Sequence, residues 1–220
     1  MKTIVISLIV FLLASFNARS QVFSFENDKA GQLPSGFFAA LTGNGSQSDW
    51  VVVDDNTLPG STKALAQKST EKVNYHFPLC INQSIDLADL TLSVRFKAVS
   101  GEIDQAAGLV WRYKDNNNYY IVRGNALEDN VVLYKCEKGK RISLAPVGTK
   151  QGTYGKSATV SKTNWNDLKV VVKGNKFDVY FNGSLLFSVV DDTFKEKGKV
   201  GLWTKADSYM LFDNFTITNN

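Results

Sequence analysis

The sequence predicts an all-β protein, folded as a sandwich of two antiparallel sheets. Apolar side chains recur at every second position in residues 168–173 and 177–181, which is the pattern of strands that bury one face. Gly174-Asn175 and Asn182-Gly183 follow these segments, and such pairs readily adopt the positive φ of tight hairpin turns. Similar short segments recur about every 8–12 residues, without a convincing amphipathic helix, which is typical of a sandwich or barrel.

The first half of the chain divides into short apolar segments separated by polar loops. Gly31, Pro34 and Gly36 interrupt the first loop, and the polar residues 43–49 form the second. Alternation of apolar and polar residues is clearest in residues 90–99. The strands expected in this half are 22–26, 37–42, 50–53, 64–67, 73–77 and 90–99.

The second half continues the pattern as a series of hairpins. Residues 114–118 and the pair Lys138-Gly139 are expected turns, because Asn, Asp and Gly tolerate positive φ. The alternating segments form a meander, and two further apolar segments end the chain. The strands expected in this half are 108–113, 119–124, 131–136, 141–147, 168–173, 177–182, 198–204 and 209–218.

The first 20 residues are predicted to be a cleaved signal peptide. Lys2 precedes an apolar run over residues 4–13, which is shorter than the roughly 20 residues of a membrane span. Ala18-Arg19-Ser20 provides small residues for cleavage before Gln21. We therefore expect export to the periplasm or the medium. Residues 21–220 contain no linker-like stretch and no internal repeat, so we expect them to form a single domain.

The charge and hydropathy of the chain argue against two classes of partner. The formal net charge of +4 falls to +2 when Lys2 and Arg19 are removed. Lys138, Lys140 and Arg141 form the only tight basic cluster, which is too small for the broad basic face of a nucleic-acid-binding protein. No later segment is apolar enough to span a membrane. We expect no nucleic acid and no stable membrane insertion, and the sequence leaves the oligomeric state undefined.

Cys80 and Cys136 are the only cysteines. Export to an oxidising compartment would permit a disulfide between them, which would close a long loop. Two separate buried thiols that pack as small apolar groups are the alternative. The sequence leaves both alternatives open, because it does not define the distance between the two Cα atoms.

Several segments resemble a known superfamily, and the resemblance extends over nearly all of residues 21–220. The segments are FSFENDKAGQLPSGF (23–37), AAGLVWRY (106–113), NNYYIVRG (117–124), LYKCEKGKRISL (133–144), VYFNGSLLF (179–187), KVGLWTKAD (199–207) and FDNFTI (212–217). They resemble the concanavalin A-like lectin/glucanase superfamily, most closely the laminin-G-like and 3-keto-disaccharide-hydrolase-type domains of exported bacterial proteins. The resemblance implies a jelly roll of two curved sheets, with ligands on the concave face or its rim.

The residues expected to bind a ligand are aromatic and basic side chains on strands that we expect to be neighbours. Sugars offer apolar faces to aromatic rings and hydroxyl groups to charged side chains. Only alternate residues of a strand share a face, so Trp203 and Lys205 are expected to act together. The candidate ligand-binding residues are Arg112, Tyr120, Tyr134, Trp203 and Lys205. The alternative is that Trp111, Tyr119 and Trp203 belong to the core.

No catalytic residues are assigned from the sequence. Glu102-Ile103-Asp104 resembles the start of a family-16 glycosidase signature, and retaining glycosidases need two carboxyl groups about 5–5.5 Å apart. The position of the further acid is occupied by Ala106 or Ala107, so the proton donor is missing. His76 is the sole histidine, and as a lone base it would need an orienting partner and a nucleophile.

A structural calcium ion is the one cofactor that the resemblance implies. Calcium prefers six to eight oxygen ligands. Glu26 and Asp213 are the candidate ligands, because the two termini of such sandwiches often meet at one edge. The acidic and amide-rich segments 54–56, 115–117 and 191–192 are more typical of turns.

These observations favour an exported, glycan-binding β-sandwich protein without recognisable catalytic residues, whose partner is a polysaccharide or oligosaccharide. A glycoside hydrolase of the 3-keto-disaccharide-hydrolase type is one alternative. A laminin-G-like protein-interaction module is the other.

Overall fold

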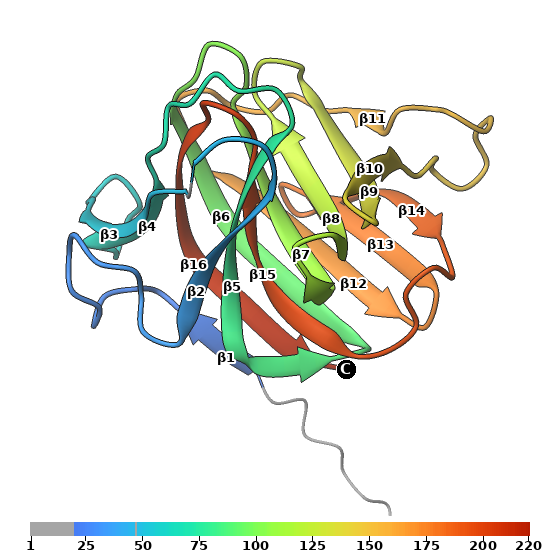
Figure 1. Cartoon of the computed structure of the whole chain (residues 1–220), viewed down its shortest axis with the longest axis horizontal. Helices are drawn as coiled ribbons and strands as arrows, with labels where there is room; N and C mark the ends of the chain where they lie inside the picture. Colours follow the sequence, from blue (N-terminus) through green and yellow to red (C-terminus); the bar gives the residue numbers. More distant parts are fainter. Residues whose placement is uncertain (1–19, 47) are drawn as a thin grey trace, which may run out of the picture.

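Two antiparallel sheets make up the described part of the chain, which covers residues 20–46 and 48–220 of a computed structural model (Figure 1). Sheet A has the order β14 (Ser184–Val190), β13 (Lys176–Phe181), β12 (Asn166–Lys173), β6 (Leu90–Ser100), β16 (Tyr209–Asn219), β4 (Lys63–Gln67) and β3 (Trp50–Asp54), and β1 (Ser20–Phe23) also pairs with β16. Sheet B has the order β10 (Lys140–Ser143), β9 (Asn130–Glu137), β8 (Asn118–Asn125), β7 (Ala106–Asp115), β15 (Gly198–Thr204), β5 (His76–Leu87) and β2 (Phe37–Gly43), and β11 (Lys156–Ser157) also pairs with β9.

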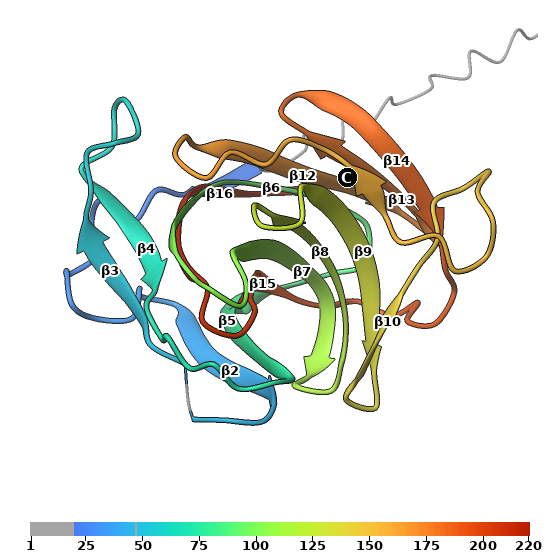
Figure 2. The same ribbon diagram turned by 90° about the horizontal axis from the view of Figure 1, so that it is seen from above.

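The architecture confirms the predicted fold class. The structure has no helix within residues 20–46 and 48–220, and its two sheets pack face to face as the two layers of a sandwich (Figure 2). No helix in these residues could therefore cross a membrane. Residues 1–19 of the expected signal peptide lie outside the described residues.

Tight turns form where the sequence predicts them. Asn182 and Gly183 both have positive φ, 46° and 83°, and join β13 to β14. Lys138 and Gly139 have φ values of 50° and 76° between β9 and β10. Two consecutive residues with positive φ match the twist of antiparallel strands, so these turns set the register of both hairpins.

The main core lies between the two sheets. Leu92, Val94 and Phe96 of β6 point into it from sheet A, whereas Leu109 and Trp111 of β7 point into it from sheet B. Alternate residues of each strand therefore meet in the middle, as the period-two pattern requires.

The structure differs from the predicted strands most clearly in β5. We expected a strand that ends at Phe77, because proline usually marks a strand edge. Instead β5 continues from His76 to Leu87, and Pro78 lies opposite Leu41 of β2 within the sheet. Pairing with β2 on one side and β15 on the other stabilises the strand despite the missing N–H of Pro78.

Sheet B is strongly curved, and its concave surface, here called the inner face, faces away from sheet A (Figure 2). The curvature brings distant segments together: the Tyr75 hydroxyl donates to the carbonyl of Gly139 at 2.8 Å and accepts the N–H of Arg141 at 2.6 Å. A second apolar cluster fills the inner face, including Phe77, Tyr134 and Trp203. The inner face is therefore largely packed with side chains.

The two cysteines are free thiols. Cys80 belongs to the core between the sheets, whereas Cys136 belongs to the cluster on the inner face. Of the two alternatives that the sequence left open, the structure has the separate buried thiols. Burial raises the pKa of Cys136 to about 11, so this thiol is protonated at neutral pH.

Candidate functional site

Charged side chains gather at one end of the inner face, where sheet B exposes its edge loops to solvent. We call Asp104, Arg123, Glu128 and Lys205, together with the neighbouring Tyr154, the charged cluster. The side chains of Glu128 and Lys205 are 35% and 26% exposed, and Tyr154 is 47% exposed. These three side chains are therefore accessible to solvent, whereas the apolar cluster beside them is buried.

The loop between β6 and β7 carries Asp104 into this cluster. The Asp207 carboxylate accepts the backbone N–H of Glu102 at 2.7 Å, of Ile103 at 3.1 Å and of Asp104 at 3.0 Å. These bonds fix the loop against the turn that follows β15. Asp104 is consequently buried, forms an ion pair with Lys205 and accepts a hydrogen bond from Asn125 at 2.5 Å.

Replacing Asp207 by asparagine tests this anchoring. The amide has one acceptor oxygen in place of two, so the variant is expected to lose about 1–3 kcal/mol of unfolding free energy at pH 7. Burial opposes ionisation of Asp207, but the three backbone N–H groups outweigh it and lower its pKa below 3.8. The stabilisation is therefore present above pH 3.8 and is lost as the pH falls through the folded-state pKa. Urea unfolding of both proteins between pH 2 and 7 should show the difference shrinking in acid, and a constant difference would contradict it.

Arg123 organises the other half of the charged cluster. Its guanidinium is buried and donates to Glu128 at 2.7 Å, to the Tyr134 hydroxyl at 3.1 Å and to the Tyr154 hydroxyl at 3.0 Å. It also lies over the rings of both tyrosines. These contacts hold the exposed ring of Tyr154 beside the carboxylate of Glu128.

The two carboxyl groups of the cluster lie in environments that shift their pKa values in opposite directions. Burial raises the pKa of Asp104, and the attraction of Lys205 opposes this rise without cancelling it. Burial also acts on Glu128, but the charge of Arg123 and the hydrogen bond from Asn130 outweigh it and lower the Glu128 pKa. Each carboxyl group also has a cationic partner, Lys205 for Asp104 and Arg123 for Glu128, which favours its ionised form.

The candidate ligand-binding residues do not form one site. Arg112 and Tyr120 are buried at the edge where the two sheets meet: Arg112 donates to the carbonyls of Ala88 and Phe194, and Tyr120 donates to Asp191 at 2.6 Å. Tyr120 points between the sheets, on the opposite side of sheet B from the inner face. These two residues hold the fold together.

Tyr134 and Trp203 do lie on the inner face, but both are buried within its apolar cluster. Trp203 is fully buried and stacks on Phe77 with ring centroids 5.4 Å apart. The alternative interpretation of Trp203 as a core residue is therefore the one that the structure has. Lys205 alone among the five candidates reaches the charged cluster with part of its side chain exposed.

The acids and the histidine considered from the sequence have separate environments. Glu102 pairs with Lys72 at the surface, whereas Asp104 is buried beside Lys205, so they do not face each other as a pair. His76 is buried, and its Nδ1 lies 2.7 Å from the carbonyl oxygen of Asn44.

Glu26 and Asp213 lie near each other, just beyond the segments in which β1 pairs with β16. Glu26 accepts the N–H groups of Thr62 and Lys63 at 2.8 and 3.1 Å, and Asp213 accepts the Ser61 hydroxyl. The Lys63 ammonium donates to the carbonyls of Glu26 and Asp28 at 2.8 and 2.7 Å. Within the described ranges, no group of three or more His, Cys, Asp or Glu side chains is placed to hold a metal ion. Calcium binding by Glu26 and Asp213 stays a prediction.

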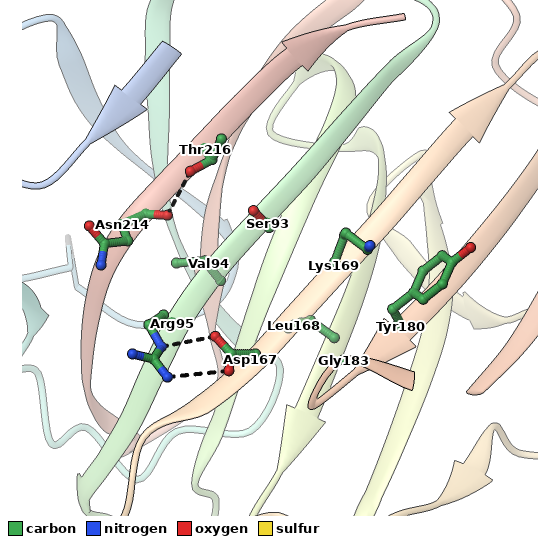
Figure 3. Close-up of a pocket in the computed structure, with 10 residues that line it drawn as sticks. All are labelled: Ser93, Val94, Arg95, Asp167, Leu168, Lys169, Tyr180, Gly183, Asn214 and Thr216. Carbon is green, nitrogen blue, oxygen red and sulfur yellow. Dashed lines mark hydrogen bonds and ion pairs between the residues drawn. The ribbon is translucent and has the colours of Figure 1, made fainter. Parts of the chain in front are cut away.

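A second surface, on the outer face of sheet A, has a shallow depression of about 330 Å³ (Figure 3). Arg95 donates to Asp167 at 2.9 Å, and the Lys169 ammonium lies over the Tyr180 ring, 4.1 Å from its centroid. These side chains satisfy one another, and exposed ion pairs of this kind contribute little energy. The charged cluster, with its buried ionisable groups, is therefore the stronger candidate.

Sequence reasoning did not select Arg123, Glu128, Arg141 or Tyr154 as ligand-binding residues. Arg141 appeared in the sequence only as part of a small basic cluster, yet its guanidinium lies 4.6 Å from the centroid of the Phe77 ring. Strand parity places Arg123 on the face opposite the selected Tyr120 and so excluded it, whereas the inner face is the side that Arg123 shares with Tyr119 and Ile121. Tyr154 lies in a loop, and the alternation of apolar and polar residues that predicts strands does not predict the path of a loop.

Solved structures with the same fold include several carbohydrate-related proteins. The carbohydrate-binding module CBM66 from Bacillus subtilis is 22% identical with a TM-score of 0.62, over 83% of this chain and 94% of that one. Domain 4 of AbnA, an extracellular arabinanase from Geobacillus stearothermophilus solved with arabinotriose, is 16% identical with a TM-score of 0.52, over 92% and 93%. At these identities the likeness establishes the fold.

Comparison by sequence identifies the family. No curated protein matches the chain. The model of one family matches residues 28–218, which include all of the charged cluster. This match confirms the resemblance seen in the sequence: the chain belongs to the family described as the 3-keto-alpha-glucoside-1,2-lyase-like domain.

Proposed function

We propose that this protein is exported and binds a carbohydrate at the charged cluster. The observation that carries the proposal is the exposed ring of Tyr154, which Arg123 holds beside Glu128. An aromatic ring bordered by charged hydrogen-bonding groups suits a sugar, which has an apolar face and a ring of hydroxyls. The names of two structurally similar proteins, a carbohydrate-binding module and an arabinanase domain with bound arabinotriose, support the same ligand class.

A glycan array probed with residues 21–220 tests this proposal. We expect specific binding to one group of glycans. The screen is run with calcium and again with a chelator, because a structural calcium at Glu26 and Asp213 is part of the proposal. Loss of binding in chelator would support a calcium site, and unchanged binding would argue against its role. A blank array would contradict glycan binding and favour a protein partner.

The site is tested by two matched tyrosine variants. Tyr154→Ala removes the exposed ring of the charged cluster and is expected to weaken binding of the best glycan about tenfold, which corresponds to about 1.4 kcal/mol. Tyr180→Ala removes a ring from the outer depression of Figure 3 and is expected to leave the affinity within about twofold. Titration calorimetry measures both. The reverse result would move the site to sheet A.

A second candidate function is the elimination named in the family description, acting on a 3-keto glycoside. The ketone acidifies the proton on the neighbouring carbon, a base removes this proton, and the glycosidic oxygen leaves with a proton from an acid. Glu128, whose carboxylate is partly exposed, is the candidate base, and Lys205, whose ammonium is partly exposed, is the candidate proton donor. The family match, together with a carboxylate and an ammonium group that are both partly exposed in one cluster, is the observation that favours the candidate.

Mass spectrometry of a 3-keto glucoside incubated with the protein would test this candidate. Release of the leaving alcohol and of an unsaturated keto sugar supports elimination, and the Glu128→Gln variant should then lose the reaction while still binding the glycan. Binding without any product would leave the protein as a carbohydrate-binding module alone.

A further inference from the structure

Arg141 differs from the other arginines in the described part of the chain. Arg95 pairs with Asp167, Arg112 donates to three backbone carbonyls, and Arg123 pairs with Glu128. Arg141 has no ion pair and no side-chain hydrogen bond within residues 20–46 and 48–220, and its Nη1 atom is buried without a partner. A buried donor without an acceptor is unfavourable, so its presence calls for an explanation.

Three aromatic rings hold the guanidinium of Arg141 in place. Its Cζ atom lies 4.6 Å from the ring centroid of Phe77, 4.5 Å from that of Tyr134 and 5.6 Å from that of Trp203. The rings belong to β5, β9 and β15, so the contact crosses the inner face from the edge strand β10. Aromatic faces attract the positive charge but accept no in-plane N–H bond.

The backbone of Arg141 is fixed as well. Its N–H donates to the Tyr75 hydroxyl, which also binds the carbonyl of Gly139. Both the backbone and the guanidinium of Arg141 are therefore fixed in position. A planar, ordered guanidinium with free donors is the group that proteins use to bind a carboxylate through two parallel hydrogen bonds.

We propose that Arg141 binds a carboxylate of the ligand, so that the preferred glycan is acidic and contains a uronic acid unit. This inference rests on the proposed function. Arg141 is partly exposed as a whole residue although its Nη1 atom is buried, so a carboxylate would approach the guanidinium from its solvent side. An entering carboxylate pairs with the one guanidinium in residues 20–46 and 48–220 that has no anionic partner.

The experiment compares charged and neutral forms of the same sugars. The probes are tetramers of galacturonate and of mannuronate, and the methyl esters of both, which keep the sugar and remove the charge. Titration calorimetry with residues 21–220 should show binding of at least one acid tetramer and an affinity at least about tenfold weaker for its ester. Affinity for the acid should also fall as salt rises, because screening weakens ion pairs.

Variants then assign the effect to Arg141. Arg141→Gln should weaken binding of the acid tetramer to the level of the ester. Arg141→Lys should give an intermediate affinity, because lysine keeps the positive charge but lacks the two parallel N–H donors of the guanidinium. Lys140→Gln removes the same charge from the exposed neighbouring position of β10 and should change the affinity less than about twofold. Thermal unfolding confirms that each variant is folded.

The possible outcomes separate this inference from the proposed function. Equal binding of acid and ester by the unaltered protein would overturn the inference, and this comparison does not depend on any variant folding. Binding of neutral glycans alone on the array would overturn the inference and leave carbohydrate binding intact. Failure of every glycan and every tetramer to bind would overturn both.

Discussion

Replacing Trp203 by alanine is expected to destabilise the protein by about 3–5 kcal/mol, in the range measured for large aromatic residues in cores. The side chain is fully buried, stacks on Phe77 and receives the guanidinium of Arg141 on its ring face. Its removal leaves a cavity in the inner face that the surrounding β-strands cannot close. The free energy of unfolding of a whole domain is about 5–15 kcal/mol, so this substitution would remove a large part of it.

Urea unfolding followed by circular dichroism measures this effect. Trp165→Ala is the matched control, because Trp165 is partly exposed and donates a hydrogen bond to Thr57 at the surface. The control is expected to lose less than about 1.5 kcal/mol. If Trp203→Ala instead unfolds at the same urea concentration as the unaltered protein, the inner face is not a packed core at this position.

Replacing Arg112 by methionine is expected to cost about 3–5 kcal/mol, the range for removal of one partner from a buried charged network. The guanidinium donates to the carbonyls of Ala88, Gly174 and Phe194, at 2.6–3.1 Å. These residues belong to three different connections between strands. Methionine fills much of the volume but leaves three acceptors without donors, so the loss reports on the hydrogen bonds.

Arg95→Met is the matched control for this variant. Arg95 is 39% exposed and pairs with Asp167 on the outer face of sheet A. Exposed pairs contribute about 0–1 kcal/mol, so the control should unfold almost as the unaltered protein does. If both variants lose the same free energy of unfolding, the hydrogen bonds of Arg112 do not stabilise the three connections.

The same local rules that predicted the strands could not predict the site. Alternation identified the buried side of β6 and β12, because each strand faces the core with every second residue. Both faces of sheet B are largely buried, so the side chains of β7 and β8 are mostly apolar on both sides. Strand parity alone therefore does not show which of the two faces packs against sheet A. Tyr120 and Trp203 were therefore assigned to one site although they lie on opposite faces.

The curvature of sheet B accounts for the remaining differences. Contact between Tyr75 and the turn at Gly139 depends on how far the sheet curls, and this is a property of the whole sheet. Arg141 is adjacent in sequence to the exposed Lys140, and nothing in that local segment indicates that its side chain crosses to Phe77. Contacts between residues so far apart in the sequence cannot be predicted from the pattern of a short local segment.

The anchoring by Asp207 has a consequence for engineering the specificity of this domain. The loop that carries Asp104 leads from sheet A to sheet B, and the turn that carries Asp207 leads back from sheet B to sheet A. Because one carboxylate holds three consecutive N–H groups of the other loop, the two crossings form one unit. To change the ligand specificity, the loop that carries Asp104 would therefore have to be replaced together with the turn that carries Asp207. Either segment alone would lack the hydrogen bonds that fix its position.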